Sequence, residues 1–341
     1  MSNVGVLGTG AYTLPVTGNR EILEYVRAPR DSAWLEEKTG VRGHSLNFDC
    51  AAGRKLSAET GLDFAERAAR QAMEAAGVEA DRIDQLCLTT CTPDRLHFMA
   101  DTIALHRRLG LRATTVVSQT DSGCAGLAKV LQEVRAYAHQ ASGHWTALVV
   151  ATNDVSSFVA CEQYKRVPGA WLSAALFADG AGAVVLGEGK GPRLMDAYCA
   201  VDGDHPLVVY HGGGAAVPPN PGTLDEHAYV MDGRDVAAQF GPAMQRAWLR
   251  LSETWKLGVE DVRRWYLHQA NYRFIESFTA ALGISPDRVP HNVDRIGNTV
   301  SASTLLLLDE DIRQGRLPED GPVVFLWVGA GMLEGGALFL P

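Results

Sequence analysis

The sequence lacks the patterns of a metal centre, a disulfide framework and a membrane span. Its six cysteines include no CxxC pair, and its ten histidines include no HExxH spacing. No stretch approaches the roughly 20 apolar residues that cross a bilayer, and no early segment joins a basic start to an apolar run. We therefore expect a cytoplasmic protein with no membrane association, no metal site and no disulfide network.

Positive charge is also scarce, since the formal net charge is −9 at pH 7. Phosphate binding depends on basic surface, so nucleic acid is not expected as a partner. A local basic patch could still dock an acidic protein. The segment GTGAY (8–12) lacks the third glycine of a dinucleotide-binding loop, and Pro15 would break the helix that should follow. NAD binding is therefore not expected.

The apolar content is high enough for a large core. The chain has 341 residues, of which 46% are apolar and 21% charged. Residues 74–90 and 255–270 each read as a helix end, a GVE turn and a buried strand. This repeat predicts a duplicated α/β unit with halves at 1–188 and 192–341, joined at the Gly- and Pro-containing seam 187–193. The Gly- and Pro-rich segment 211–227 is expected to form a long surface loop.

Cys124 lies where a β-branched run stops at small residues and an amphipathic helical pattern begins. That position predicts a thiol at a strand-to-helix elbow. The unpaired N–H groups at a helix start favour thiolate over thiol, so we expect a nucleophilic cysteine with a lowered pKa. The alternative is a small buried hydrophobe, as most cysteines are.

Two later residues stand at similar junctions. His268 follows the buried run Trp265 to Leu267, at the strand end where α/β proteins hold working side chains. Asn298 lies between Gly297 and Thr299, before another helical pattern. By position alone, His268 also fits a satisfied core histidine, and Asn298 fits an ordinary turn or cap residue.

Seven motifs together resemble the 3-oxoacyl-[acyl-carrier-protein] synthase III family, condensing enzymes of the thiolase superfamily. They are GTGAYTLP (8–15), SAWLEEKTGVR (32–42), GCAG (123–126), LFADGAGAVVL (176–186), HQANYR (268–273), DRIGNTVSAS (294–303) and GAGMLEGGAL (329–338). The resemblance covers essentially the whole chain. It implies an α/β thiolase-like fold, in which duplicated βαβαβαββ halves form an αβαβα layered sandwich, and a homodimer.

The resemblance also implies a catalytic triad of Cys124, His268 and Asn298. In the family an acyl group is loaded on the cysteine and then undergoes decarboxylative Claisen condensation with a malonyl-type carrier thioester. The backbone amides of Cys124 and Ala330 would form the oxyanion hole. No tightly bound cofactor is implied, because the substrates arrive on the phosphopantetheine of an acyl carrier protein or of coenzyme A.

Six further positions match substrate- or carrier-binding residues of the family: Trp34, Lys38, Phe98, Arg234, Asn271 and Arg273. The resemblance implies that Trp34 stacks the coenzyme A adenine and that Phe98 crosses the dimer interface to the partner's acyl pocket. It also implies that Asn271 lies near the pantetheine arm and that Arg273 helps carrier docking. Without the resemblance, Phe98 fits a core aromatic and Arg273 a solvated surface residue.

Three of the nucleotide- and pantetheine-binding positions depart from the family pattern. Lys38 and Trp171 stand where arginines are expected, and Arg234 stands where an asparagine is expected. We therefore predict that coenzyme A is not the preferred donor and that an acyl carrier protein or an unusual substrate is. Asp121 and Ser122 make the flank of Cys124 more polar, which favours polyketide or other specialised metabolism.

Three other functions remain open at this point. The same acyl-cysteine could pass its acyl group to an alcohol or amine, with His268 as general base. The chain could instead be a noncatalytic, acyl-binding partner subunit, although the complete triad argues against that. Thioester hydrolysis would require rapid attack of water on the acyl-cysteine.

Overall fold

The computed structural model describes residues 4–141, 143–204, 208–209 and 215–341. A mixed sheet runs through the chain in the order β13-β14-β15-β10-β1-β9-β8-β6-β7. Its strands are β1 (Gly5–Tyr12), β6 (Gln85–Thr89), β7 (Val116–Thr120), β8 (Ala147–Asn153), β9 (Gly180–Gly187), β10 (Arg193–Val201), β13 (Arg264–Leu267), β14 (Val323–Gly329) and β15 (Leu333–Leu340).

The sheet has two arms with the same pattern. In the first arm β1, β9 and β8 are antiparallel neighbours and β6 and β7 follow in parallel. In the second arm β10, β15 and β14 are antiparallel and β13 is parallel to β14. The arms join where Gly5 of β1 pairs with Arg193 of β10. The repeat segments 74–90 and 255–270 contain β6 and β13, and each of these strands is the first parallel strand of its arm. The domain boundary at 188–192 stays a prediction.

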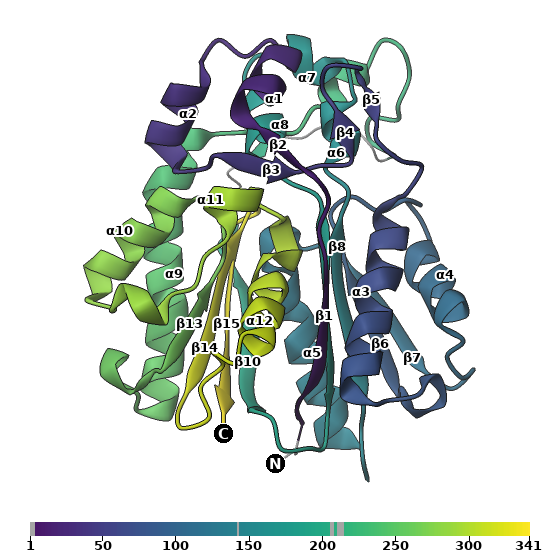
Figure 1. Cartoon of the computed structure of the whole chain (residues 1–341), viewed down its shortest axis with the longest axis vertical. Helices are drawn as coiled ribbons and strands as arrows, with labels where there is room; N and C mark the ends of the chain where they lie inside the picture. The colour runs from purple at the N-terminus through teal and green to yellow at the C-terminus, as the bar shows by residue number, and fades with distance from the viewer. Residues whose placement is uncertain (1–3, 142, 205–207, 210–214) are drawn as a thin grey trace.

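Helices form three layers around the two arms (Figure 1). Helices α3 (Gly61–Ala76) and α4 (Ala100–Leu109) cover the outer face of the first arm, and α9 (Gly233–Trp255), with α10 (Tyr272–Leu282) beside it, covers that of the second. Helix α5 (Gly126–Gln140) contacts β6 and β8 on one side and β10 and β15 on the other, and α12 (Ser303–Arg313) likewise contacts β1, β9 and β13. The predicted αβαβα sandwich is confirmed.

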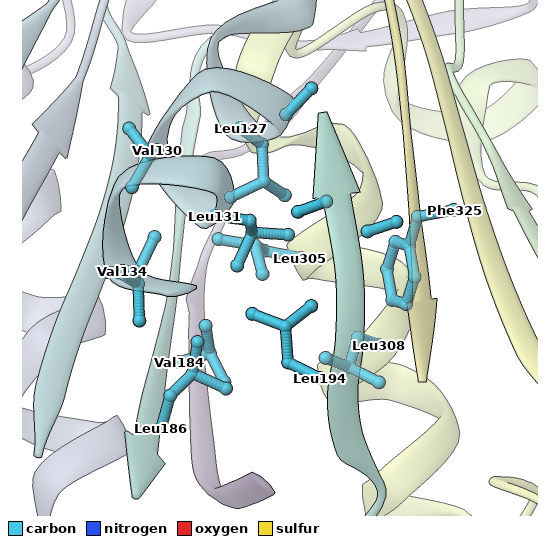
Figure 2. Close-up of a cluster of buried hydrophobic side chains, with 14 of the residues drawn as sticks. Leu127, Val130, Leu131, Val134, Val184, Leu186, Leu194, Leu305, Leu308 and Phe325 are labelled. Carbon is cyan, nitrogen blue, oxygen red and sulfur yellow. The ribbon is translucent and has the colours of Figure 1, made fainter. Parts of the chain in front are cut away.

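The middle layer is the apolar centre of the molecule. Figure 2 shows Leu127 and Leu131 of α5 beside Leu305 of α12, with strand residues of both arms around them. Leu127, Leu131 and Leu305 are at most 2% exposed, and each such side chain contributes roughly 1.5–3 kcal/mol by leaving water. This packing holds the first turns of α5 and α12 close together.

Short elements gather over one end of the sheet, at the top of Figure 1. They are α1 (Asn19–Tyr25), α2 (Ser32–Thr39), α6 (Ser156–Val159), α7 (Gln163–Arg166), α8 (Ala170–Leu176), α11 (Val293–Ile296), β2 (Val16–Gly18), β3 (Gly43–Ser45), β4 (Phe48–Asp49) and β5 (Arg54–Lys55). Strands β11 (Val208–Val209) and β12 (Val230–Met231) form a separate two-stranded sheet. The 3-10 turns are η1 (Ala80–Arg82), η2 (Gly123–Ala125), η3 (Leu224–His227), η4 (Val259–Asp261), η5 (Pro286–Arg288) and η6 (Val300–Ala302).

Part of the predicted loop 211–227 lies outside the described residues, namely 211–214, and its remainder runs over exposed turns into η3. Within the described ranges, no helix has both the length and the apolar character that a bilayer span requires. The same residues contain no group of three or more His, Cys, Asp or Glu side chains that could hold a metal ion.

Candidate active site

Cys124 lies at the predicted elbow between a strand and a helix. Strand β7 ends at Thr120, turn η2 carries the cysteine, and α5 begins two residues later. Gly123 has a φ of 49°, a conformation that favours glycine. At Gly126 the reason for glycine is space, because a Cβ there would lie 2.0 Å from Thr89 Oγ1. The two glycines of GCAG thus allow the backbone to turn before α5 and to pack closely against Thr89.

His268 directly follows β13, and its amide donates to the Leu326 carbonyl at 2.8 Å, which continues the pairing with β14. The side chain is fully buried, and neither ring nitrogen has a hydrogen-bond partner among the described residues. The Phe240 ring meets the imidazole edge-on at 6.5 Å. Burial lowers the pKa of His268 to about 3, so the imidazole is neutral at pH 7.

Asn298 is held in place by its own backbone and side chain. Its amide donates to the Leu176 carbonyl at 3.1 Å, and its carbonyl accepts from the Ala178 amide at 2.8 Å. The side-chain Oδ1 accepts from the Val300 amide at 2.8 Å. Since the oxygen is engaged, the Nδ2 donors are left for the site, and the carboxamide hydrogen-bonds to the Cys124 thiol.

The backbone on both sides of Asn298 is unusual. Gly297 has φ 75° and ψ −178°, a region open essentially only to glycine. A Cβ at Gly297 would also lie 2.7 Å from His44 Nδ1. Val300 has a φ of 57°, which a β-branched residue rarely adopts and which costs about 1–3 kcal/mol. The sequence gives no signal of this strain.

One cavity brings the three predicted triad residues together. It offers about 40 Å³ of space open to a water molecule. Cys124, His268 and Asn298 line it with Leu176, Phe177, Tyr229, Met231, Val236, Phe240, Ala270, Asn271 and Ala330. Most of the wall is apolar, so polar groups of a substrate would find few hydrogen-bond partners besides the three triad side chains and the backbone.

The segment 329–331 approaches the cysteine turn closely. A Cβ on Gly329 would lie 3.3 Å from the Cys124 amide nitrogen and 3.0 Å from that of Ala125. This contact requires glycine at 329, whereas Ala330 lines the cavity. The two backbone segments predicted to form an oxyanion hole therefore border the same space.

The expected lowering of the Cys124 pKa is wrong. The side chain is 9% exposed, and its burial raises the pKa to about 12, although hydrogen bonds from Asn298 and from the cysteine's own amide act in the opposite direction. The helix start that was expected to favour thiolate is outweighed by the loss of water around the sulfur. Cys124 is a neutral thiol at rest.

The predicted carrier-binding residues separate into two groups. Asn271 lines the cavity, and its side chain caps α10 by accepting from the Phe274 amide at 2.8 Å. The other five are not among the cavity-lining residues. Phe98 is 89% exposed, so the alternative of a core aromatic is wrong. Arg234 is exposed in the first turn of α9.

The remaining three lie on α2 and α10. The Trp34 ring has the Arg30 guanidinium 5.4 Å from its centroid and the Trp171 ring 6.1 Å away, tilted by 59°. Lys38 pairs with Glu37 at 2.8 Å. Arg273 pairs with Glu276 at 2.7 Å and also donates to the Glu37 carbonyl. Both exposed cations are thus engaged with neighbouring acidic residues.

Several residues around Cys124 could not be identified from the sequence. Tyr229 and Met231 line the cavity, although they lie more than 100 positions away along the chain. The Tyr229 ring stacks on Phe158 at 6.1 Å and meets Phe177 edge-on at 6.0 Å. A Tyr and a Met before a helix are ordinary packing residues by pattern, so no local signal distinguished them.

Comparisons with known proteins find similar sequences over nearly the whole chain. Residues 253–340 match the model described as 3-Oxoacyl-[acyl-carrier-protein (ACP)] synthase III C terminal, and residues 44–190 match that of Chalcone and stilbene synthases, N-terminal domain. The chain is 31% identical to the beta-ketoacyl-[acyl-carrier-protein] synthase III of Symbiobacterium thermophilum, with 97% of this chain and 96% of that protein covered. The Methylococcus capsulatus protein of the same name is also 31% identical, with 98% and 97% covered.

A solved structure gives the same result for the fold. The crystal structure of 3-oxoacyl-(acyl carrier protein) synthase III from Pseudomonas aeruginosa superimposes with a TM-score of 0.82 at 27% identity, covering 99% of this chain and 98% of that one. The predicted thiolase-like α/β fold is confirmed.

Proposed function

The chain belongs to the 3-oxoacyl-[acyl-carrier-protein] synthase III family of condensing acyltransferases, and on that premise we propose that Cys124, His268 and Asn298 catalyse a decarboxylative Claisen condensation. The acyl group comes from one carrier thioester and the two-carbon unit from a malonyl-type carrier thioester. The supporting observation is the pair of neutral donors, His268 and Asn298, that share a buried cavity with the thiol.

In the first half-reaction Cys124 attacks the thioester carbonyl. The new bond joins the sulfur to the acyl carbon, and the bond to the carrier sulfur breaks. In net terms the cysteine proton leaves with the carrier thiol. The amides of Cys124 and Ala330 stabilise the transient oxyanion, and the hydrogen bond from Asn298 lowers the cost of forming the thiolate.

In the second half-reaction the malonyl thioester loses CO2 and leaves an enolate. Its oxygen needs neutral donors, because a protonated base would transfer its proton and quench the enolate. The His268 imidazole N–H, which has no partner among the described residues, and the Nδ2 of Asn298, whose Oδ1 is held by the Val300 amide, supply them. The enolate carbon then attacks the acyl carbon, and Cys124 departs as a thiolate that regains a proton.

The His268 environment disfavours acyl transfer to an alcohol or amine. That reaction needs a general base with a pKa near the working pH. Burial without a carboxylate partner lowers the pKa of His268 to about 3, which makes the imidazole a weak base. The same neutral imidazole is suited to donating a hydrogen bond, which is the role that condensation requires.

We propose a carrier protein as the preferred acyl donor. The Arg30 guanidinium lies over the Trp34 ring and the Trp171 ring lies tilted beside it, so two side chains already contact the ring on which an adenine would stack. Lys38 is a point charge already paired with Glu37. These departures support a role in polyketide or other specialised metabolism.

A homodimer is part of the same proposal. Strand β7, which leads to Cys124, is the last strand of the sheet, and among the described residues it pairs with β6 only. Large exposed apolar side chains lie nearby, just before and on α4, which packs on β7: Leu96, Phe98, Met99 and Ile103. An unpaired edge strand with exposed apolar side chains beside it is a ready surface for a second copy.

Intact mass spectrometry tests the proposed reaction. Wild type, Cys124→Ala and Cys199→Ala are exposed to acyl carrier proteins and acyl-coenzyme A esters, and then chased with malonyl carrier while CO2 is measured. We expect acylation of wild type and Cys199→Ala only, with discharge and CO2 release, because Cys199 is a free cysteine that does not line the cavity. Acylation that the malonyl carrier cannot discharge would favour transfer to an alcohol or amine. Absence of acylation with every donor would favour a noncatalytic subunit.

A further inference from the structure

Asn153, the last residue of β8, is a fully buried side chain whose carboxamide is hydrogen-bonded at both ends. Its Oδ1 accepts from the amide of Cys91 at 3.1 Å and from the Cys91 thiol at 3.2 Å. Its Nδ2 donates to the Thr299 carbonyl at 3.3 Å and to Ser301 Oγ at 3.1 Å. Two acceptor sites and two donors account for the whole hydrogen-bonding capacity of the group.

The two donor contacts bracket Val300. Thr299 and Ser301 are its chain neighbours, and both bonds cross from the first arm of the sheet to the turn before α12. Val300 itself has a φ of 57°. A β-branched residue keeps that conformation only where several surrounding contacts hold the backbone in it. Asn153 supplies two of the contacts that do so.

The strained residue is also the one that orients Asn298. The Val300 amide donates to Asn298 Oδ1 at 2.8 Å, and this bond directs the Nδ2 of Asn298 to the cavity. If Val300 relaxed to a negative φ, its N–H would turn away from that oxygen. The carboxamide would then be free to rotate and could present an acceptor where the proposed reaction needs a donor.

We propose that Asn153 is a positioning residue that holds the Val300 turn strained and thereby aims the Asn298 carboxamide. The inference rests on the proposed condensation, in which Asn298 donates to the enolate oxygen. Asn153 does not line the cavity, so it acts through the turn and not on the substrate. An aspartate at this position would keep an acceptor for Cys91 but would set a carboxylate oxygen against the Thr299 carbonyl.

Asn153→Ala and Asn153→Asp test the proposal when the two half-reactions are measured separately. Acylation of Cys124 is followed by intact mass spectrometry, and discharge of the acyl-enzyme by malonyl carrier is followed by CO2 release. We expect discharge to slow by about 10- to 100-fold, as misplacement of a supporting group does. Acylation should change by no more than a few-fold, since it depends chiefly on the cysteine turn.

Val300→Gly provides a rescue that separates positioning from general stability. Glycine adopts a φ of 57° without strain and keeps the N–H that Asn298 needs. In the Val300→Gly background, Asn153→Ala should therefore slow discharge much less than in wild type. An undiminished effect would overturn the link from Asn153 through Val300.

Asn47→Ala is the matched control, because Asn47 is another fully buried asparagine whose side chain holds a loop, through the Ser57 and Glu59 carbonyls. It should lower stability without changing the ratio of the two rates. If Asn47→Ala shifts the ratio as Asn153→Ala does, or if Asn153→Ala leaves it unchanged, the proposal is wrong while the condensation stands. If wild type itself releases no CO2, the proposed function fails first.

Discussion

Gly123 and Val300 occupy equivalent positions in the two arms of the molecule. Each begins a three-residue 3-10 turn with a positive φ, 49° and 57°, directly before a helix of the middle layer. The two turns pack against each other. Cys124 follows the first of these residues and Asn298 precedes the second by two positions. The internal duplication therefore brings the nucleophile and the carboxamide to one site from opposite arms.

Gly297→Ala should destabilise the protein strongly. The new Cβ would meet His44 Nδ1 at 2.7 Å and Ala178 Cβ at 3.0 Å, in a backbone region that only glycine enters easily. We expect a loss of about 3 kcal/mol, which combines strain and overpacking. Urea unfolding measures it.

Gly77→Ala is the matched control, since Gly77 has a φ of 62° but nothing lies within 4 Å of an added Cβ. Backbone strain alone should cost about 1–2 kcal/mol there. Equal losses for the two variants would show that the contact with His44 does not constrain the Asn298 loop.

The stability of the wild type should fall between pH 6.5 and pH 4 in part through His268. Its folded pKa is lowered to about 3 by burial, so below the ordinary value of about 6.5 the unfolded state binds a proton that the folded state does not. The full stability is present above pH 6.5 and is lost progressively as the pH falls. At pH 5 the loss from this group is roughly 2 kcal/mol. Urea unfolding of wild type and His268→Gln should give a shallower slope for the variant, and parallel slopes would contradict the assignment.

Alkylation of Cys124 by iodoacetamide should be slow at neutral pH and should keep rising with pH beyond 9, where an ordinary thiol is already half ionised. Burial raises the thiol pKa to about 12, while the hydrogen bond from Asn298 lowers it. Asn298→Ala should therefore raise the pKa further and slow alkylation several-fold at a fixed pH. Peptide mapping of the modified protein identifies the cysteine. Faster alkylation in the variant would show that Asn298 shields the sulfur more than it stabilises the thiolate.

Phe98→Glu should shift the protein from dimer to monomer. The side chain is 89% exposed, and a charge there would disfavour burial against a second copy. Light scattering after size exclusion measures the change. Leu249→Glu is the control, because Leu249 is an apolar residue of α9 that is 44% exposed. A wild-type monomer, or the same shift with both variants, would exclude this surface as the interface.

Much of the fold could be predicted because its signals are local. The strand and helix periods around 74–90 and 255–270 depend on neighbouring residues, and the repeat between them indicated the duplicated architecture. Cys124, His268 and Asn298 could be proposed because each stands at an element junction and in a specific motif. Their placement in one cavity needed the packed middle layer, which joins residues far apart in the chain.

The electrostatics of the site could not be predicted from local sequence. A helix start alone suggested a lowered pKa for Cys124, whereas burial raises it. Burial depends on side chains such as Phe177 and Val300, which come from other parts of the chain. Desolvation depends on every group around the sulfur. Whether its effect on the thiol pKa exceeds the effects of the helix start and the hydrogen bonds is therefore decided only in the folded protein.

By itself the sequence determined the order of the elements, the duplicated α/β plan and the chemical identity of the proposed triad, because periodicity, turn residues and motifs are written locally. Only the tertiary structure decided that His268 is neutral, that Cys124 is a thiol at rest and that the turn at Val300 is strained and tied to Asn153. These properties depend on contacts between residues more than 140 positions apart, and such contacts exist only once the two arms have packed around their shared helices.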